Sequence, residues 1–144
     1  MELAVKTLKT GFIKAITTTL TLMKVVLPVY ALVVVIKYSP IMALLQKVFE
    51  PAMGIFSLPS TAAIPIITGI FTDEYGAIAT ATQFDFTMWQ LTTIAMINLV
   101  CHGLPVEYAL SKKIGLPAGR FVAYRVVSAV LIGLIISWIG GVLL

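Results

Sequence analysis

The stretch that decides the fold is STAAIPIITGIFTDEYGAIATATQF, residues 60–84. Residues 60–71 and 77–84 are apolar or small, and the polar sequence TDEYG at residues 72–76 separates them. At about 1.5 Å per residue, limbs of roughly 12 and 8 residues cross only about half of a hydrocarbon core of about 30 Å. They fit a re-entrant helical hairpin with the acidic pair at its tip, which we favour. The alternative is one continuous span, in which two carboxylates near the centre would cost several kcal/mol unless they were paired.

The composition of the whole chain is that of an integral membrane protein. Of its 144 residues, 60% are hydrophobic and 11% are charged, and the mean hydropathy is +1.05. A soluble domain carries roughly 25% charged residues, so this chain cannot cover a surface that faces water. The composition therefore excludes a soluble enzyme, a nucleic-acid-binding domain and a disordered tail. The single cysteine permits no intramolecular disulfide.

Apolar runs long enough to cross a bilayer, which takes about 20 residues, occur at residues 15–36, 86–106 and 121–144. Pro28 is expected to kink the first of these spans. Residues 1–14 place apolar side chains on one helical face and lysines on the other. This pattern indicates a short helix that lies in the membrane interface.

Between these runs, residues 41–50 are predicted to form a short amphipathic helix that ends before Pro51. Residues 107–120 are predicted to form a basic loop. Basic residues are concentrated near the N-terminus and late in the chain, around this loop, so the positive-inside rule places both groups on the cytoplasmic side. Because each basic group borders an apolar run, we expect no nucleic-acid partner.

The predicted fold is therefore a single membrane domain over residues 1–144, all α-helical and in contact with the lipid bilayer. It contains about three transmembrane helices, a re-entrant helical hairpin and an amphipathic N-terminal helix. We expect a multi-pass protein of the cell membrane, that is, the inner or cytoplasmic membrane.

Polar side chains inside the apolar runs are the candidate functional residues. Helix interruptions at membrane depth expose free backbone groups, and secondary transporters bind solutes and ions there. Asn98 and His102 are one helical turn apart and form a polar stripe. A solvated loop at the hairpin tip and hydrogen bonds between neighbouring helices are the structural alternatives. The candidate solute-binding residues are Thr68, Thr72, Asp73, Glu74, Asn98, His102 and Tyr124.

The sequence offers no pattern for catalysis, a metal or a cofactor. It has no HExxH motif and no phosphate-binding glycine loop, so we expect the protein not to be an enzyme. Cys101 and His102 are adjacent and would diverge by about 100° on a helix, and one Cys with one His makes no recognisable ligand set. We therefore expect neither a metal site nor a cofactor.

Small residues recur at four-residue spacing along the last span, at Ala129, Gly133, Ser137 and Gly141. This spacing lets helix backbones approach closely. It predicts a packing interface, either within the chain or between protomers.

Residues 58–81 resemble the nucleoside-recognition, or gate, domain family of small membrane proteins, through a pattern of proline, glycine and acidic residues. A later Gly-Leu-Pro at residues 115–117 adds to the likeness, which covers nearly the whole chain. The family includes spore maturation proteins A and B and the gate domains of the ferrous-iron permease. The tetrapeptide FVAY at residues 121–124 is similar to one in concentrative nucleoside transporters, where a glutamate precedes it; here Arg120 stands in that place and removes an acceptor for sugar hydroxyls.

The resemblance implies a re-entrant hairpin and a chain that is half of a transport unit, because related transporters pair two repeats of opposite orientation. We expect a homodimer, for which an antiparallel arrangement is open, or a complex with a sister protein of the same family. The expected function is a half-transporter that binds a nucleoside or similar small polar solute at the hairpin. Two alternatives stay open: a metal-ion gate like that of the iron permease, and a membrane assembly protein that transports nothing.

Overall fold

The computed structural model describes residues 2–143, and the side chains of residues 2–4, 25 and 141–143 fall outside that description. Over this range the chain is built from α-helices and short connections, without a β-strand. In chain order these elements are α1 (Glu2–Lys37), α2 (Ile41–Gly54), the 3-10 turn η1 (Ser60–Ala62), α3 (Ala63–Phe71), α4 (Glu74–Ala81), α5 (Met88–Cys101), α6 (Leu104–Lys113) and α7 (Ala118–Leu143).

Within residues 2–143, three helical segments are long and apolar enough to cross a membrane: Val5–Lys37, Met88–Lys113 and Ala118–Gly140. The second consists of α5 and α6 together. The prediction of an all-α membrane protein with about three spanning segments is thereby confirmed.

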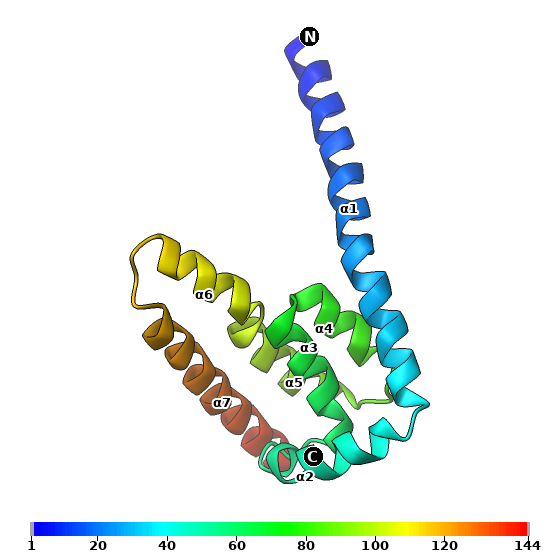
Figure 1. The fold of residues 1–144 in the computed structure, drawn as a ribbon, viewed down its shortest axis with the longest axis vertical. Coiled ribbons are helices and arrows are strands. Elements are labelled where there is room, and N and C mark those ends of the chain that lie inside the picture. The colour runs from blue at the N-terminus through cyan, green and yellow to red at the C-terminus, as the bar shows by residue number, and fades with distance from the viewer. Residues whose placement is uncertain (1, 144) are drawn as a thin grey trace.

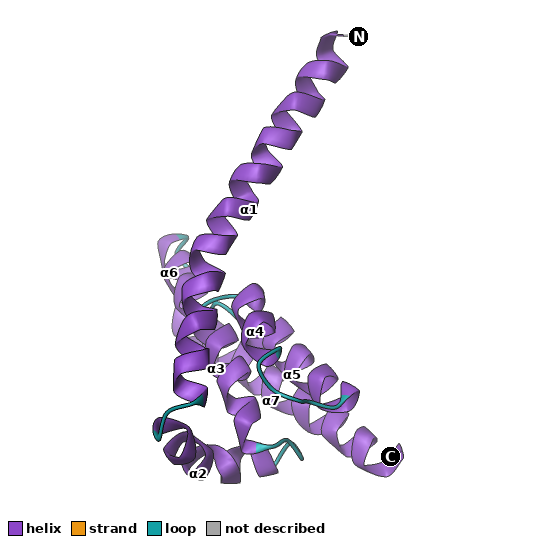
Figure 2. Cartoon of the chain, turned by 90° about the vertical axis from the view of Figure 1, so that its right-hand side faces the viewer, coloured by secondary structure: helices purple, strands orange, loops and turns teal. Residues whose placement is uncertain are grey.

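Helix α1 is continuous, whereas an interfacial helix over residues 1–14 and a separate span over residues 15–36 were expected. No turn or capping motif separates the two stretches, and Pro28 lies inside the helix without ending it. The N-terminal half of α1 extends away from the other helices (Figures 1 and 2). Its C-terminal part packs against α4 and α2.

Helices α3 and α4 form the hairpin predicted over residues 60–84, and they pack against each other (Figure 1). Only Thr72 and Asp73 separate them, so this stretch is not one continuous span. Before the hairpin, α2 is longer than the predicted helix over residues 41–50, because it continues through Pro51 to Gly54.

The prediction for residues 86–120 differs from the structure in two ways. Residues 86–106 do not form one helix, since α5 ends at Cys101 and α6 begins at Leu104. The predicted basic loop over residues 107–120 is mostly helix, because α6 extends to Lys113. The physical reason is local: Gly103 takes a left-handed conformation with φ of 61°, which favours glycine, and Pro105 in the first turn of α6 suits a helix start.

The core lies where α2, α3, α5 and α7 meet. Helix α7 packs along α5 and α6, which agrees with the predicted span over residues 121–144 except that α7 starts at Ala118. Among the described residues, the buried apolar cluster consists of Met53, Leu58, Ala62, Ala63, Ile66, Ile94, Ile97, Cys101, Leu104 and Ala129.

The ends of the helices gather toward two opposite ends of the molecule (Figure 1). In Figure 1 the turn between α6 and α7 lies toward the same end of the molecule as the N-terminus. Helix α2 and the C-terminal end of α7 lie toward the opposite end. Lys112 and Lys113 end α6, so this group of basic residues and the lysines near the N-terminus lie toward one end of the fold.

Candidate functional site

The turn of the hairpin is stabilised by its own polar side chains. Asp73 is the N-cap of α4, and its Oδ1 accepts a hydrogen bond from the backbone N–H of Gly76 at 2.8 Å. Thr72 Oγ1 donates to the carbonyl oxygen of Thr68 at 2.7 Å. Asp73 thereby satisfies a backbone N–H that a helix N-terminus leaves free, whereas the carbonyl of Thr68 also accepts a hydrogen bond from the backbone N–H of Thr72. Glu74, the next residue, takes part in none of these hydrogen bonds.

The break between α5 and α6 lies directly against this hairpin. The backbone N–H of Gly103 donates to the carbonyl oxygen of Gly69 at 2.9 Å. Two helix interruptions, the hairpin turn and the α5–α6 break, are therefore in contact. Their backbone groups are partly satisfied by one another, which is how irregular backbone is tolerated at membrane depth.

Glu74 and His102 connect the two interruptions through their side chains. His102 Nδ1 lies 3.2 Å from Glu74 Oε2 and 3.0 Å from the carbonyl oxygen of Asn98. The carbonyl oxygen of Asn98 can only accept a hydrogen bond, so this contact is made in the tautomer whose Nδ1 carries the hydrogen. About a third of each side chain, 32% for His102 and 31% for Glu74, is exposed.

This contact lies near the middle of a spanning segment. Helix α5 contributes 14 residues before the break and α6 contributes 10 after it, and the two form one candidate span of 26 residues. At about 1.5 Å per residue, the break is roughly 20 Å from one end and 15 Å from the other. An ionisable pair at that depth is a functional-site candidate.

Asn98 is the most deeply buried polar side chain near the pair, with 1% of its surface exposed. Its Nδ2 donates to the carbonyl oxygen of Pro65 at a long 3.4 Å, and its Oδ1 has no hydrogen-bond partner. Gly69 makes the close approach possible, because a Cβ at this position would overlap Oδ1. An unsatisfied buried acceptor of this kind costs about 1 to 3 kcal/mol.

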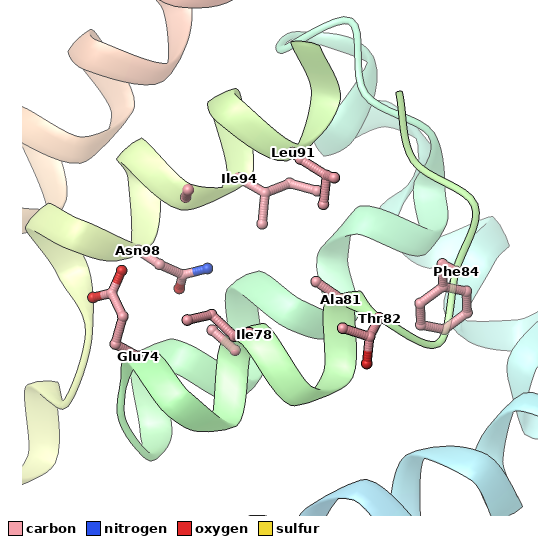
Figure 3. Close-up of a pocket in the computed structure, with 10 residues that line it drawn as sticks. Glu74, Ile78, Ala81, Thr82, Phe84, Leu91, Ile94 and Asn98 are labelled. Carbon is pink, nitrogen blue, oxygen red and sulfur yellow. The ribbon is translucent and has the colours of Figure 1, made fainter. Parts of the chain in front are cut away.

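A pocket of about 350 Å³ opens beside these residues, between α4 and α5 (Figure 3). Glu74 and Asn98 lie at one end of it and Phe84 at the other, while Ile78 and Ile94 line the walls. The complete lining is Glu74, Ala77, Ile78, Ala81, Thr82, Phe84, Leu91, Ile94, Ala95 and Asn98. The pocket thus has one polar end and largely apolar walls.

The structure brings together three of the predicted solute-binding residues: Glu74, Asn98 and His102. Thr68 and Thr72 instead line a separate, apolar pocket of about 310 Å³ between α1, α2 and α3. Asp73 is engaged in capping α4.

Tyr124 is not among the residues that line either pocket, and it is 73% exposed on α7. None of the FVAY residues, 121–124, lines the pocket between α4 and α5.

The predicted small-residue interface is used within the chain. Ala129, Gly133 and Ser137 are buried, and a Cβ at Gly133 would lie 2.9 Å from Ile97 Cδ1 of α5. The surroundings of Gly141 lie outside the described residues. A neighbouring small residue, Gly140, packs against the Trp89 ring.

Arg125 of α7 contacts both helices that flank the α5–α6 break. Its Nε donates to the carbonyl oxygen of Val100 at 2.6 Å, and its guanidinium forms an ion pair with Glu107 of α6. Arg125 therefore holds the last turn of α5 and the first turn of α6 to α7. Sequence reasoning did not predict this role, although Glu107 is the acidic residue that follows the break in the sequence.

The groups named as potential metal ligands do not gather in one place. Cys101 is buried in the apolar core with 2% exposure, whereas His102 contacts Glu74. Over residues 2–143, no group of three or more His, Cys, Asp and Glu side chains is placed to hold a metal ion.

Comparison with known proteins gives one similar curated protein. The chain is 35% identical over 135 residues to the uncharacterized membrane protein YvoD of Bacillus subtilis (strain 168). The match covers 91% of this chain and 43% of that protein, so the chain spans less than half the length of this relative. No protein-family model matches the chain, and no solved structure matches it. The similarity and the three apolar segments together identify an integral membrane protein.

Proposed function

We propose that this chain is half of a membrane transporter and binds a nucleoside, or a similar small polar solute, in the pocket between α4 and α5. The observation that carries the proposal is the meeting of two helix interruptions through Glu74 and His102, 3.2 Å apart. Transporters bind their solutes where broken helices meet near the midplane of the bilayer. The role is binding and passage of a solute, without catalysis.

The lining of the pocket fits the chemistry of such a solute. A volume of about 350 Å³ falls within the range of pockets for small molecules. Glu74 keeps a second carboxylate oxygen beyond the one that contacts His102, and this oxygen accepts hydrogen bonds from hydroxyl or amino groups. The Asn98 side chain also lines the pocket, while its Oδ1 is buried against Gly69. The apolar walls suit the faces of a planar ring.

The resemblance of residues 58–81 to the nucleoside-recognition family supports the same solute class. Arg120 replaces the glutamate that precedes the FVAY tetrapeptide in concentrative nucleoside transporters, and we propose that Glu74 supplies the acceptor instead. The alternatives draw less support. The metal-gate alternative requires ligands that stand apart. An assembly protein would need an interface with other chains, but the small-residue stripe at Gly133 packs against α5 of the same chain.

The proposal is tested by thermal unfolding of the detergent-purified protein with nucleosides, free bases, divalent metal ions and simple anions. A ligand that binds only the folded state raises the free energy of unfolding, by about 2.7 kcal/mol at a hundred times its Kd. We expect nucleosides to raise the Tm. The increase should disappear in Glu74→Gln and in Asn98→Ala, each compared with its own ligand-free Tm.

Thr68→Val is the matched control, because it removes one hydroxyl from the other pocket and keeps the side-chain shape. It should retain the nucleoside-dependent increase. An increase that survives in Glu74→Gln, or one caused by metal ions alone, would overturn the proposal.

A further inference from the structure

The Glu74–His102 pair is partly exposed and surrounded by an apolar surface. About a third of each side chain is exposed, and the pair lies near the middle of the candidate span Met88–Lys113. The exposed large side chains of the adjoining segments are apolar: Phe71, Tyr75, Ile78, Leu99 and Val106 are each more than half exposed. The surface is therefore apolar with an ionisable pair inside it.

Lipid cannot cover this surface as it stands. A charged or ionisable side chain at the bilayer centre is costly when it faces hydrocarbon, and such residues almost always face protein or a water-filled cavity. Exposed apolar side chains alone would call for no explanation in a membrane protein. The Glu74 carboxylate and the His102 imidazole among them, each about a third exposed, do call for one.

We propose that a second copy of this chain covers the surface formed by Tyr75, Ile78 and Leu99 around the Glu74–His102 pair, and closes the pocket between α4 and α5. The inference deepens the proposed function, on which the role of the shared pocket rests. The interface itself follows from the placement of the Glu74–His102 pair. It can therefore be tested independently of the proposed solute.

The chemistry of the patch favours a second copy over an unrelated protein. In a twofold dimer the same patch meets itself, so it must be self-complementary. This patch presents one acid and one base side by side, with apolar side chains around them. Rotation by a twofold axis brings Glu74 toward His102 of the partner subunit, and the apolar side chains against one another.

The similar protein of Bacillus subtilis agrees with this arrangement. More than half of that chain lies outside the match, which leaves room for a segment as long as the matched one.

Disulfide cross-linking in membranes tests the inference with the full chain. The single native cysteine is first removed as Cys101→Ala. Tyr75→Cys, Ile78→Cys and Leu99→Cys are then introduced one at a time, and Tyr75→Cys is also co-expressed with Leu99→Cys. Leu131→Cys on α7 is the control, because Leu131 is 54% exposed against 57% for Ile78 and also lies near the middle of its span.

After mild oxidation we expect a product of twice the chain mass from at least one α4 or α5 variant, several-fold more abundant than from Leu131→Cys. Equal cross-linking at Leu131, or no product from any variant, would overturn the inference. A product of another mass would show that a different protein covers the surface, and would also overturn it.

The solute experiment separates this inference from the proposed function. Cross-linking without nucleoside-dependent stabilisation would leave the interface standing and remove the solute. Nucleoside-dependent stabilisation without cross-linking would support the solute and remove the interface.

Discussion

The backbone N–H of Gly103 donates a hydrogen bond to the carbonyl oxygen of Gly69 at 2.9 Å, and so joins the α5–α6 break to the α3–α4 hairpin. The local geometry favours glycine at both positions. Gly103 has a positive φ of 61°, and Gly69 leaves no room for a Cβ beside Asn98. The polar centre of the molecule thus depends on two positions that carry no side chain.

Gly69→Ala should lower the Tm, because the new methyl group would overlap Asn98 Oδ1 and push α3 away from α5. Overpacking of this kind costs about 1 to 3 kcal/mol. Thermal unfolding in detergent measures the change. Gly11→Ala is the control: nothing lies within 4 Å of a Cβ at Gly11, and replacing a helical glycine should stabilise the helix by about 0.5 to 1 kcal/mol. Equal effects of the two substitutions would contradict the described packing at Asn98.

Gly133→Val should destabilise the folded chain itself, since a Cβ at this position would lie within 3.0 Å of Ile97 and Phe56. Gly119→Val on the same helix has open space around it and should change the Tm little. The quantities to measure are the Tm and the fraction of Ile78→Cys that cross-links. A lower cross-linked fraction with an unchanged Tm would instead place the small-residue stripe between copies.

Asp73→Ala should cost about 1 kcal/mol of stability, because it removes the side chain that caps α4. Asp73→Asn should cost far less, since asparagine caps helices as well as aspartate does. Both variants should keep the nucleoside-dependent rise in Tm that Glu74→Gln loses. If Asp73→Asn loses that rise while its ligand-free Tm is unchanged, Asp73 belongs to the binding site after all.

The hairpin could be predicted from the sequence because its evidence is local. The limbs on either side of residues 72–76 are too short to cross a bilayer, and an acidic pair at their junction favours a turn. Glu74 and Asn98 could likewise be predicted as candidate residues, since each is a polar side chain within an apolar stretch. Which of the predicted residues share a pocket could not, because that depends on how α4 and α5 pack.

The α5–α6 break was missed because residues 86–106 are apolar enough on average, and long enough, to form one span. The signal was present in Gly103-Leu104-Pro105, a glycine able to take positive φ followed by a proline suited to a helix start. The continuity of α1 was missed because residues 1–14 are amphipathic and residues 15–36 are apolar. This change in composition suggested a helix boundary, although nothing interrupts the backbone of the helix there.

Lys37, the last residue of α1, lies at the far end of the pocket from Glu74. Its Nζ contacts the carbonyl oxygen of Gln83 and lies 5.2 Å from the centre of the Phe84 ring, which lines the pocket. Helix α1 has 36 residues and is therefore about 54 Å long, well beyond the thickness of a hydrocarbon core of about 30 Å. The helix therefore runs from its contact with Phe84, in the wall of the pocket, to a point outside the hydrocarbon core, so a single rigid element joins the pocket wall to the membrane surface.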